Sequence, residues 1–190
     1  GGVGGSVGDG GSGGAPLPLE CTATADNLLG PYYRPGAPKR DDLTEPGMLG
    51  TRITVQGRVF GPDCELLAGA LIDVWQADAE GGYDNDGVAD PPPSEYVLRG
   101  KLYSSAAGNY SFRSIVPGHY LNGAQYRPAH IHVTVSADGY LPITTQLYFE
   151  GDPYNAIDPF IIESLIMKPV KQTNGELVAP YDFVLQPTSS

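Results

Sequence analysis

Two histidines, His130 and His132, are the residues whose types and spacing most directly suggest chemistry. They lie in residues 129–135, where polar and apolar side chains alternate as on a half-buried strand. Side chains two residues apart on a strand share one face, and two rises of ~3.3 Å put these imidazoles about 6.6 Å apart. Both could therefore turn onto one metal ion. The alternative is the polar face of an edge strand.

Two tyrosines, Tyr83 and Tyr120, are further candidate donors. Tyr83 comes soon after the expected strand that contains Trp75, and Tyr120 soon after the strand that ends at Ile115. Glycines precede both tyrosines, and a glycine there lets the backbone bend and turn a side chain inward. By position alone, each is otherwise an ordinary packed tyrosine.

No other set of metal donors stands out in the sequence. The two cysteines, Cys21 and Cys64, do not have the spacing of zinc ligands. Most carboxylates lie in expected loops, where a solvated surface explains them. An acidic third ligand beside His130 and His132 would give a zinc or copper site, as in a hydrolase. The residues alone leave this alternative open.

Short stretches of alternating side chains, separated by glycine and proline, make up most of the chain after Cys21. The expected strands are residues 53–59, 68–75, 98–104, 109–115, 129–135, 143–149 and 177–185. Residues 98–104 and 109–115 are expected to pair with each other about a turn at 106–108. Residues 158–168 suggest one or two helical turns. This pattern predicts an all-β fold, an antiparallel β-sandwich with long active-site loops and little helix.

Composition excludes several classes of partner. The chain has 190 residues and a net charge of -11, which argues against nucleic acid or an anionic membrane surface. No apolar run approaches the roughly 20 residues of a membrane span. A chain of this length forms one domain, with or without a tail.

The start of the chain suggests export. Residues 1–20 are expected to form a flexible Gly/Ser-rich tether ahead of one domain at residues 21–190, because the tether has too little apolar surface to offset its ordering entropy. The sequence begins at Gly1, so a signal or a tag is expected to have been removed. This layout predicts a periplasmic, extracellular or surface-anchored protein, and the tether could carry the anchor.

The cysteines fit the same prediction. A bridge between Cys21 and Cys64 would close a loop worth roughly 3–4 kcal/mol in the chain-entropy model. Disulfides are typical of exported proteins. We expect this bridge; the alternative is two separate buried thiols.

A series of motifs, in order from about Gly30 to Pro153, resembles the intradiol ring-cleavage dioxygenases, the catechol 1,2- and protocatechuate 3,4-dioxygenases. The motifs are Gly-Pro-Tyr-Tyr at 30–33, Leu-Ala-Gly-Ala-Leu-Ile-Asp-Val-Trp-Gln-Ala-Asp at 67–78, Gly-Tyr at 82–83, Leu-Arg-Gly at 98–100, Tyr-Ser-Phe-Arg-Ser-Ile-Val-Pro-Gly-His-Tyr at 110–120, Arg-Pro-Ala-His-Ile-His at 127–132 and Gln-Leu-Tyr-Phe-Glu-Gly-Asp-Pro at 146–153. The histidine run together with both tyrosine motifs makes the resemblance specific.

The resemblance implies a mononuclear non-haem Fe(III) site. Its ligands would be Tyr83, Tyr120, His130 and His132. The chemistry of these groups agrees, because a free phenol titrates near pH 10 and a tyrosinate at neutral pH needs a strong Lewis acid beside it. Anionic oxygen donors favour Fe(III), in contrast to the two-histidine, one-carboxylate site of ferrous oxygenases.

The resemblance also implies a reaction. A catechol-type diol would be cleaved by O2 between its two hydroxylated carbons to a muconate-type diacid. Tyr120 would be the axial ligand that accepts a substrate proton, and Arg127 would stabilise negative charge on the substrate. Gln146 matches a glutamine near the same pocket. The alternative for Arg127 is a surface ion pair. The expected pocket walls, besides Arg127, are Tyr32, Tyr33, Trp75, Asp84 and Phe160, each of which could also be ordinary packing.

Some positions depart from the family pattern. His119 stands where the family usually has proline, so it either supports the site or is exposed. The loop at residues 121–126 lacks the tryptophan and basic residues of the protocatechuate enzymes, which argues against a carboxylated substrate. The helical dimerisation segment of catechol dioxygenases is absent, so the protein is either a monomer or a homo-oligomer. A non-catalytic β-sandwich binding or adhesion module stays open as an alternative, and the particular catechol is not predicted.

Overall fold

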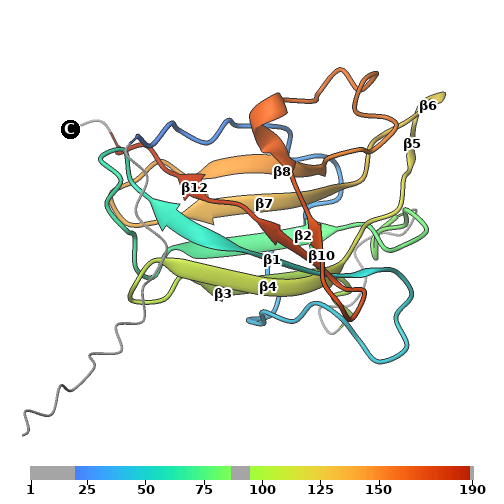
Figure 1. Ribbon diagram of the computed structural model, residues 1–190, viewed down its shortest axis with the longest axis horizontal. Coiled ribbons are helices and arrows are strands. Elements are labelled where there is room, and N and C mark those ends of the chain that lie inside the picture. The colour runs from blue at the N-terminus through green and yellow to red at the C-terminus, as the bar shows by residue number, and fades with distance from the viewer. Residues whose placement is uncertain (1–19, 87–94, 189–190) are drawn as a thin grey trace, which may run out of the picture.

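The protein is a sandwich of two five-stranded β-sheets with a separate two-stranded hairpin (Figure 1). The computed structural model describes residues 20–86 and 95–188. The expected tether at residues 1–20 therefore lies outside the described residues, apart from Glu20. Among the described residues, no helix is long and apolar enough to cross a membrane. The predicted all-β sandwich with little helix is confirmed.

The first sheet is built around its longest strand, β1 (Arg52–Phe60). One edge of β1 pairs antiparallel with β4, and its other edge pairs in parallel with β11 and then β12. The other strands are β4 (Asn109–Ile115), β10 (Val170–Lys171), β11 (Leu177–Pro180) and β12 (Phe183–Val184). This sheet is thus mixed rather than wholly antiparallel.

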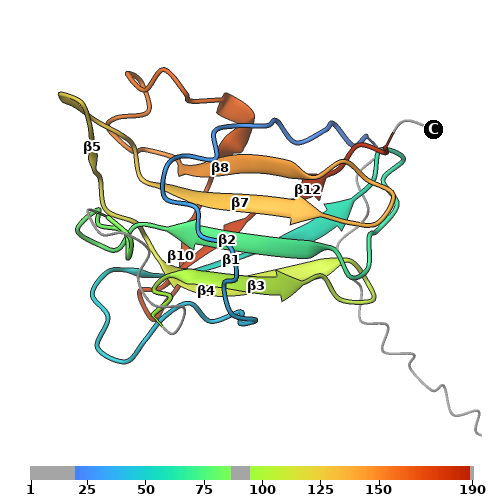
Figure 2. The same cartoon turned by 180° about the vertical axis from the view of Figure 1, so that it is seen from behind.

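The second sheet has the order β3-β2-β7-β8-β9 and carries the histidine strand near its centre (Figure 2). Its strands are β2 (Leu71–Gln76), β3 (Arg99–Tyr103), β7 (His130–Ser136), β8 (Ile143–Phe149) and β9 (Ile166–Met167). Among these five strands, β9 pairs in parallel with β8 and the other pairings are antiparallel. Because β7 lies between β2 and β8, the alternative that the two histidines decorate an edge strand is wrong.

One hydrophobic core fills the space between the two sheets. The inward faces of β1 and β2 supply buried residues such as Val55 and Ile72, and β7 supplies Ile131 and Val133. Each buried aliphatic side chain contributes roughly 1.5–3 kcal/mol to folding. Because side chains alternate on a strand, packing Ile131 and Val133 inward turns the neighbouring histidines to the outer face of the second sheet.

Two details of the expected strand pattern are wrong. Residues 98–104 and 109–115 do not form a hairpin, because β3 pairs with β2 and β4 pairs with β1. The turn between them, where Gly108 donates to the Ser105 carbonyl, carries the chain from one sheet to the other. The expected last strand at 177–185 is two short strands, β11 and β12. A turn signal marks a change of direction but not which strand becomes the partner.

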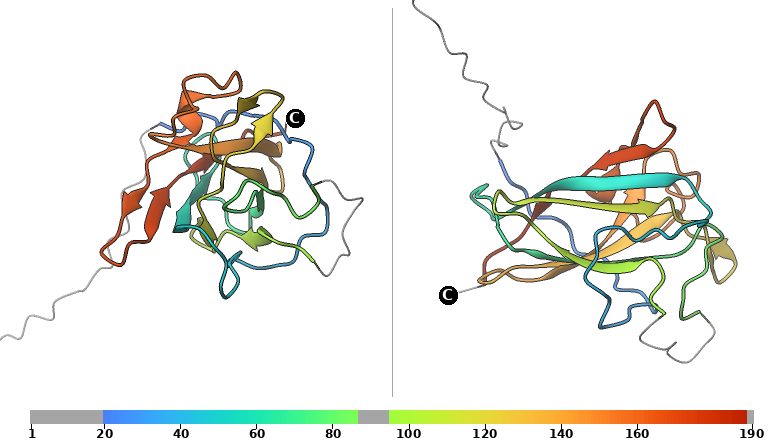
Figure 3. Two further views of the ribbon diagram at one scale, coloured as in Figure 1. Left: turned by 90° about the vertical axis from the view of Figure 1, so that its right-hand side faces the viewer. Right: turned by 90° about the horizontal axis from the view of Figure 1, so that it is seen from below.

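The helical segment is shorter than expected. Within residues 158–168 the structure has a single 3₁₀ turn, η1 (Glu163–Leu165), followed directly by β9. The hairpin of β5 (Leu121–Asn122) and β6 (Gln125–Tyr126) projects from the body. Strands β2, β4 and β8 end at the same end of the sandwich, on the right in Figure 1, and β7 begins there. The segments that follow β2, β4 and β8 therefore lie close to the start of β7 (Figure 3, left).

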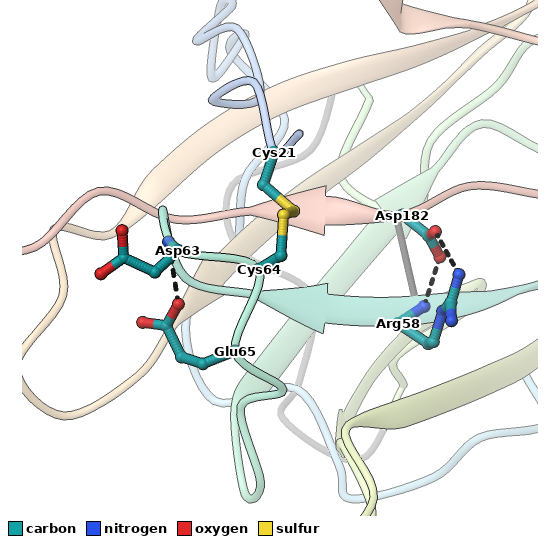
Figure 4. Close-up of a disulfide and its surroundings, with 6 residues drawn as sticks. All are labelled: Cys21, Arg58, Asp63, Cys64, Glu65 and Asp182. Carbon is teal, nitrogen blue, oxygen red and sulfur yellow. Dashed lines mark hydrogen bonds and ion pairs between the residues drawn. A yellow bond between two sulfur atoms is a disulfide. The ribbon is translucent and has the colours of Figure 1, made fainter. Parts of the chain in front are cut away.

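The predicted disulfide is present at the opposite end. Cys21 and Cys64 are bonded, with their Cα atoms 5.4 Å apart, and the bond ties the first described residues to the turn after β1 (Figure 4). Beyond it, the Thr24 amide donates to the Val184 carbonyl and the Asn27 amide to the Thr144 carbonyl. These bonds lead the segment across the second sheet toward the site.

Candidate metal centre

Four side chains that lie far apart in the sequence converge at the loop end of the sandwich. The Tyr83 hydroxyl is 3.1 Å from His132 Nε2, and the Tyr120 hydroxyl is 3.2 Å from His130 Nε2. The two imidazole rings are 4.8 Å apart and the two phenol rings 5.8 Å apart, centre to centre. We refer to Tyr83 and His132 as the Tyr83 pair, and to Tyr120 and His130 as the Tyr120 pair.

Strand register places the histidines. Arg99 of β3, Trp75 of β2, His132 of β7 and Gln146 of β8 stand side by side in one row across the second sheet. His130 lies two residues before His132 on the same face and is paired with Tyr148 of β8. The expected sharing of a face by the two imidazoles is confirmed.

Two tightly packed loops place the tyrosines. The Asp78 carboxylate accepts the amide hydrogens of Glu80 and Gly82, which shapes the turn before Tyr83. The Gly118 amide, two residues before Tyr120, donates to the Asp78 carbonyl at 2.7 Å. The two tyrosine-bearing loops are therefore hydrogen-bonded to each other.

Two glycines make this close approach of the loops possible. A Cβ atom on Gly81 would lie 2.2 Å from the His119 carbonyl oxygen, and one on Gly118 would lie 2.5 Å from the Ala79 carbonyl oxygen. Gly81 also has a φ of 91°, which side chains rarely tolerate. Any larger residue at either position would push the loops apart.

The imidazoles are held neutral, and the Nε2 atom of each faces a tyrosine hydroxyl. Burial lowers the pKa of His130 to about 4, with the Arg127 charge acting in the same direction. Burial, followed by the neighbouring His130, holds the pKa of His132 well below its usual value. His130 Nδ1 is 2.7 Å from the Pro128 carbonyl, which can only accept, so Nδ1 carries the proton. Nε2 is then free to bind a cation.

The phenols are uncharged unless a cation lies among them. Burial raises the pKa of Tyr83 well above 10, and the neighbouring Tyr120 adds to the effect. Burial also raises the pKa of Tyr120, opposed by the Arg127 charge. Two phenol oxygens and two neutral imidazoles at one point fit a trivalent cation such as Fe(III), which would displace both phenolic protons. Among the described residues, no group of three or more His, Cys, Asp or Glu side chains is arranged to hold a metal.

Aromatic rings enclose the Tyr83 pair. Tyr32 stacks on Tyr83 with the ring centres 4.3 Å apart, and Trp75 stacks on His132 at 5.1 Å. Tyr33 packs edge-on against Trp75 and donates its hydroxyl to Asp73. The predicted pocket residues Tyr32, Tyr33 and Trp75 are thus all beside the site, with Tyr32 partly exposed.

Asp84 differs from the prediction that it is a pocket wall. Its buried carboxylate is bound by Arg34 at 2.7 Å and by Arg99 at 2.6 Å, and it accepts the Val97 amide hydrogen. All three side chains of this ion group are at most 5% exposed. A carboxylate engaged in this way supports the backbone next to Tyr83 rather than contacting a substrate. Sequence reasoning missed Arg34 and Arg99.

Arg127 lies beside the Tyr120 pair and is not on the surface. Its guanidinium donates to Gln146 Oε1 at 2.9 Å and to the Tyr148 hydroxyl at 3.2 Å, and it makes an ion pair with Asp158 at 2.8 Å. Phe160 packs below it, with its ring centre 5.0 Å from the guanidinium carbon. The structure therefore brings Arg127, Gln146 and Phe160 together, and the surface ion pair proposed as the alternative is wrong.

Two further residues of this cluster were missed by sequence reasoning. Tyr148 could have been found, because it lies two residues after Gln146 on the same face of β8. Asp158 gave no local signal, since it comes from an irregular loop 31 residues after Arg127. His119, whose role the sequence left open, is partly buried and contacts Asp152.

One large cavity lined by the described residues lies away from this site. It has a volume of about 1100 Å³, lies between β3 and β4, and is lined by residues such as Lys39, Tyr103 and Tyr110. Tyr83, Tyr120, His130 and His132 do not line this cavity. The candidate chemistry is therefore at the loop end and not in this cavity.

Comparisons with known proteins identify the family of this chain. The sequence model of a family described as Dioxygenase matches residues 28–188. Chlorocatechol 1,2-dioxygenase of Rhodococcus opacus is 34% identical over 191 residues, which cover 86% of this chain and 72% of that protein. Catechol 1,2-dioxygenase 2 of Acinetobacter lwoffii is 38% identical over 151 residues, which cover 69% of this chain and 53% of that protein.

Solved structures of dioxygenases are also similar to this chain. The dioxygenase domain of a dioxygenase carbohydrate-binding protein fusion from Streptomyces sp. SirexAA-E is 37% identical, with a TM-score of 0.77 over 88% of this chain and 100% of that chain. The 3-chlorocatechol 1,2-dioxygenase of Rhodococcus opacus 1CP is 28% identical, with a TM-score of 0.79 over 87% of this chain and 73% of that chain. The chain therefore belongs to the intradiol ring-cleavage dioxygenases, a family of oxidoreductases.

Proposed function

We propose that this protein cleaves a catechol-type diol with O2, using one ferric ion held by Tyr83, Tyr120, His130 and His132. The carbon–carbon bond between the two hydroxylated carbons breaks, both oxygen atoms of O2 enter the product, and a cis,cis-muconate-type diacid forms. The observation that carries the proposal is the convergence of two phenol–imidazole pairs, each within hydrogen-bond distance, whose rings pack against each other. The matches to catechol and chlorocatechol 1,2-dioxygenases support it.

The two tyrosines have different roles in this proposal. When bound, the ferric ion would bind the diol oxygens and draw electron density from the ring, which prepares it for O2. Acting as a phenolate, Tyr120 would accept one substrate proton at its oxygen atom and give up its place to the substrate. Its position suits that role, since its ring is only partly buried whereas Tyr83 is enclosed. His130, His132 and Tyr83 keep their places.

Arg127 is the residue that stabilises negative charge on the substrate ring. Its guanidinium is held by Gln146, Tyr148 and Asp158, so it does not reorganise as the charge develops. A fixed, buried positive charge is far more effective than a mobile one in water. Gln146 is itself fixed, because its amide donates to the Leu28 carbonyl.

The preferred substrates should be catechols without a carboxylate. The exposed hairpin at residues 121–126 has no basic residue to pair with a carboxylate. The walls nearest the Tyr83 pair are aromatic, from Tyr32, Tyr33 and Trp75. Phe160 lies against Arg127 and adds an apolar surface.

We also propose that the protein is exported. The disulfide between Cys21 and Cys64 supports this, because such bonds persist mainly in oxidising compartments. Anchoring through the expected tether concerns residues that the structure does not describe.

One experiment tests the function against its alternatives. The protein is loaded with iron, its visible spectrum is recorded, and O2 uptake is measured with plain, alkylated, chlorinated, hydroxylated and carboxylated catechols. A wine-red tyrosinate-to-iron band and O2 uptake with all but the carboxylated diols are expected. A binding module would consume no O2, and a zinc or copper hydrolase would have no such band. A colourless iron complex, or no uptake with any diol, would overturn the proposal.

A further inference from the structure

We propose that His119 is a positioning residue that acts through Asp152 to hold Tyr120 against His130. The inference rests on the proposed function, because it concerns how readily Tyr120 gives up its place to a substrate. It concerns a position at which this chain departs from the proline usual in the family.

A single carboxylate joins the segments that carry these two groups. His119 Nε2 donates to Asp152 Oδ2 at 2.7 Å, and the Ala129 amide donates to the same oxygen at 3.0 Å. His119 directly precedes Tyr120, and Ala129 directly precedes His130. The Asp152 side chain is 6% exposed, and its other oxygen accepts the Tyr154 amide hydrogen. Asp152 is therefore held in place independently of His119.

The Tyr120 ring packs against Tyr32, Tyr83 and His130, but the chain that follows it is weakly anchored. The six residues that follow it, 121–126, are all exposed, and their contacts with the body include a hydrogen bond from Gln125 to the Ile157 carbonyl and the Tyr126 ring against Tyr154. The nearest later backbone contact is the bond from the Arg127 amide to the Tyr120 carbonyl. On the near side, the Gly118 amide is bonded to the Asp78 carbonyl. The His119 side chain thus links the Tyr120 loop, through Asp152, to the residue that precedes the strand carrying His130.

The link through Asp152 therefore favours the state in which Tyr120 stays beside His130. With the link intact, the Tyr120 hydroxyl is kept within 3.2 Å of His130 Nε2. Without it, Tyr120 is held less firmly, so a diol displaces it more easily but Tyr120 returns less readily when the product leaves. A charge-assisted hydrogen bond is worth about tenfold or more in an equilibrium constant, and partial exposure of His119 argues for the lower end.

The test compares three variants with the parent. His119→Ala removes the link, and His119→Gln retains an N–H donor that can reach Asp152. Tyr154→Phe is the control, because the ring of Tyr154 packs edge-on against His119 at 4.7 Å and its backbone amide, which binds Asp152, is unchanged. For each, iron per chain, thermal stability, anaerobic catechol affinity from the visible band, kcat and KM are measured. Hydrogen exchange of the peptide spanning residues 118–127 is followed in the metal-free protein.

His119→Ala should bind catechol anaerobically about tenfold more tightly, with KM and kcat both lowered, iron content unchanged and faster exchange in the 118–127 peptide. His119→Gln should restore most of the parent behaviour, and Tyr154→Phe should match the parent. If His119→Ala does not fold, Asp152→Asn should tighten catechol binding about threefold, since the neutral acceptor makes a weaker bond.

Two results would overturn the inference. One is an anaerobic catechol affinity within twofold of the parent in His119→Ala, or in Asp152→Asn where that variant replaces it. The other is a change that occurs only in step with loss of iron or thermal stability, which would mean a purely structural role. Failure of the proposed function is a separate result, since the parent itself would then show no visible band or no O2 uptake.

Discussion

The Tyr83 pair and the Tyr120 pair have the same chemistry but opposite surroundings. Tyr83 is buried under Tyr32, its partner His132 is stacked on Trp75, and the residue after it belongs to a buried ion group. Tyr120 is only partly buried and is followed by an exposed hairpin. The site thus joins a rigid half to a half that can open.

This difference would let the proposed iron site keep one tyrosine in place while the other exchanges with the substrate. A ligand enclosed by packing cannot leave without disturbing the core, whereas a partly buried one that is followed by an exposed hairpin can leave at smaller cost. Fixed positive charge is placed beside the half that opens, since Arg127 is held there by Asp158. The predictions below test this division.

The largest effect is expected from removing each phenol oxygen in turn. Tyr120→Phe should keep iron through the other three ligands but lower turnover by about 10²–10⁴-fold, the contribution of a general base. Tyr83→Phe should lose most of the visible band and the iron as well as activity. Iron per chain, visible spectra and O2 uptake distinguish the two. Tyr32→Phe, which keeps the stacked ring, is the control and should retain colour and iron. Colour untouched by both substitutions would show that the phenols are not on the metal.

The next effect concerns stability of the rigid half. Asp84→Asn removes the negative charge that Arg34 and Arg99 both bind in the protein interior, which should lower the free energy of unfolding by about 3–5 kcal/mol. Asp42→Asn is the matched control, because the ion pair of Asp42 with Arg113 is exposed and is worth at most about 1 kcal/mol. Urea unfolding measures both. Equal losses in the two variants would contradict a special role for the buried group.

Arg127→Ala should affect chemistry rather than metal binding. Turnover should fall about 10²-fold, as expected on losing one electrostatic stabiliser, with iron content and the visible band unchanged. Arg113→Ala, at an exposed arginine, should have no effect on turnover. Loss of iron from Arg127→Ala would instead assign Arg127 to the support of the ligands.

The smallest effect is expected on the pH dependence of stability, at Asp73, which binds the Tyr33 hydroxyl beside the rigid half. Burial raises the pKa of this carboxyl above its usual 3.8, opposed by Lys101, and its Oδ1 atom has no hydrogen-bond partner among the described residues. The folded protein therefore holds this proton to higher pH than the unfolded chain, so this contribution to stability declines as the pH rises from 3.8 through the folded pKa.

Asp73→Asn removes the loss of stability that accompanies ionisation of this carboxyl. At neutral pH the variant should be as stable as the parent or more stable, by at most about 1 kcal/mol, because an amide can still accept from Tyr33. Urea unfolding at pH 4.5 and 7.5 would check the sign. A variant that loses stability at pH 7.5 relative to pH 4.5 by more than the parent does would show that the ionised carboxylate is favourable.

The sequence anticipated the site better than the strand pairing. Alternation on one strand places His130 and His132 on a shared face, and the family resemblance points to Tyr83 and Tyr120. Asp158, Arg34 and Arg99 were missed because their roles depend on contacts between segments that only the folded chain brings together. The wrong hairpin has the same cause, since the turn at residues 106–108 reads alike whether its strands pair or change sheets.

The glycine contact between the tyrosine loops has a consequence for engineering. Because the Gly81 backbone lies against the His119 carbonyl and Gly118 against the Ala79 carbonyl, the two loops fit each other as a matched set. A chimera that imports one loop from a relative brings a backbone shaped for a different partner. Residues 78–83 and 117–120 should therefore be transplanted together, and libraries intended to change substrate range should keep both glycines fixed.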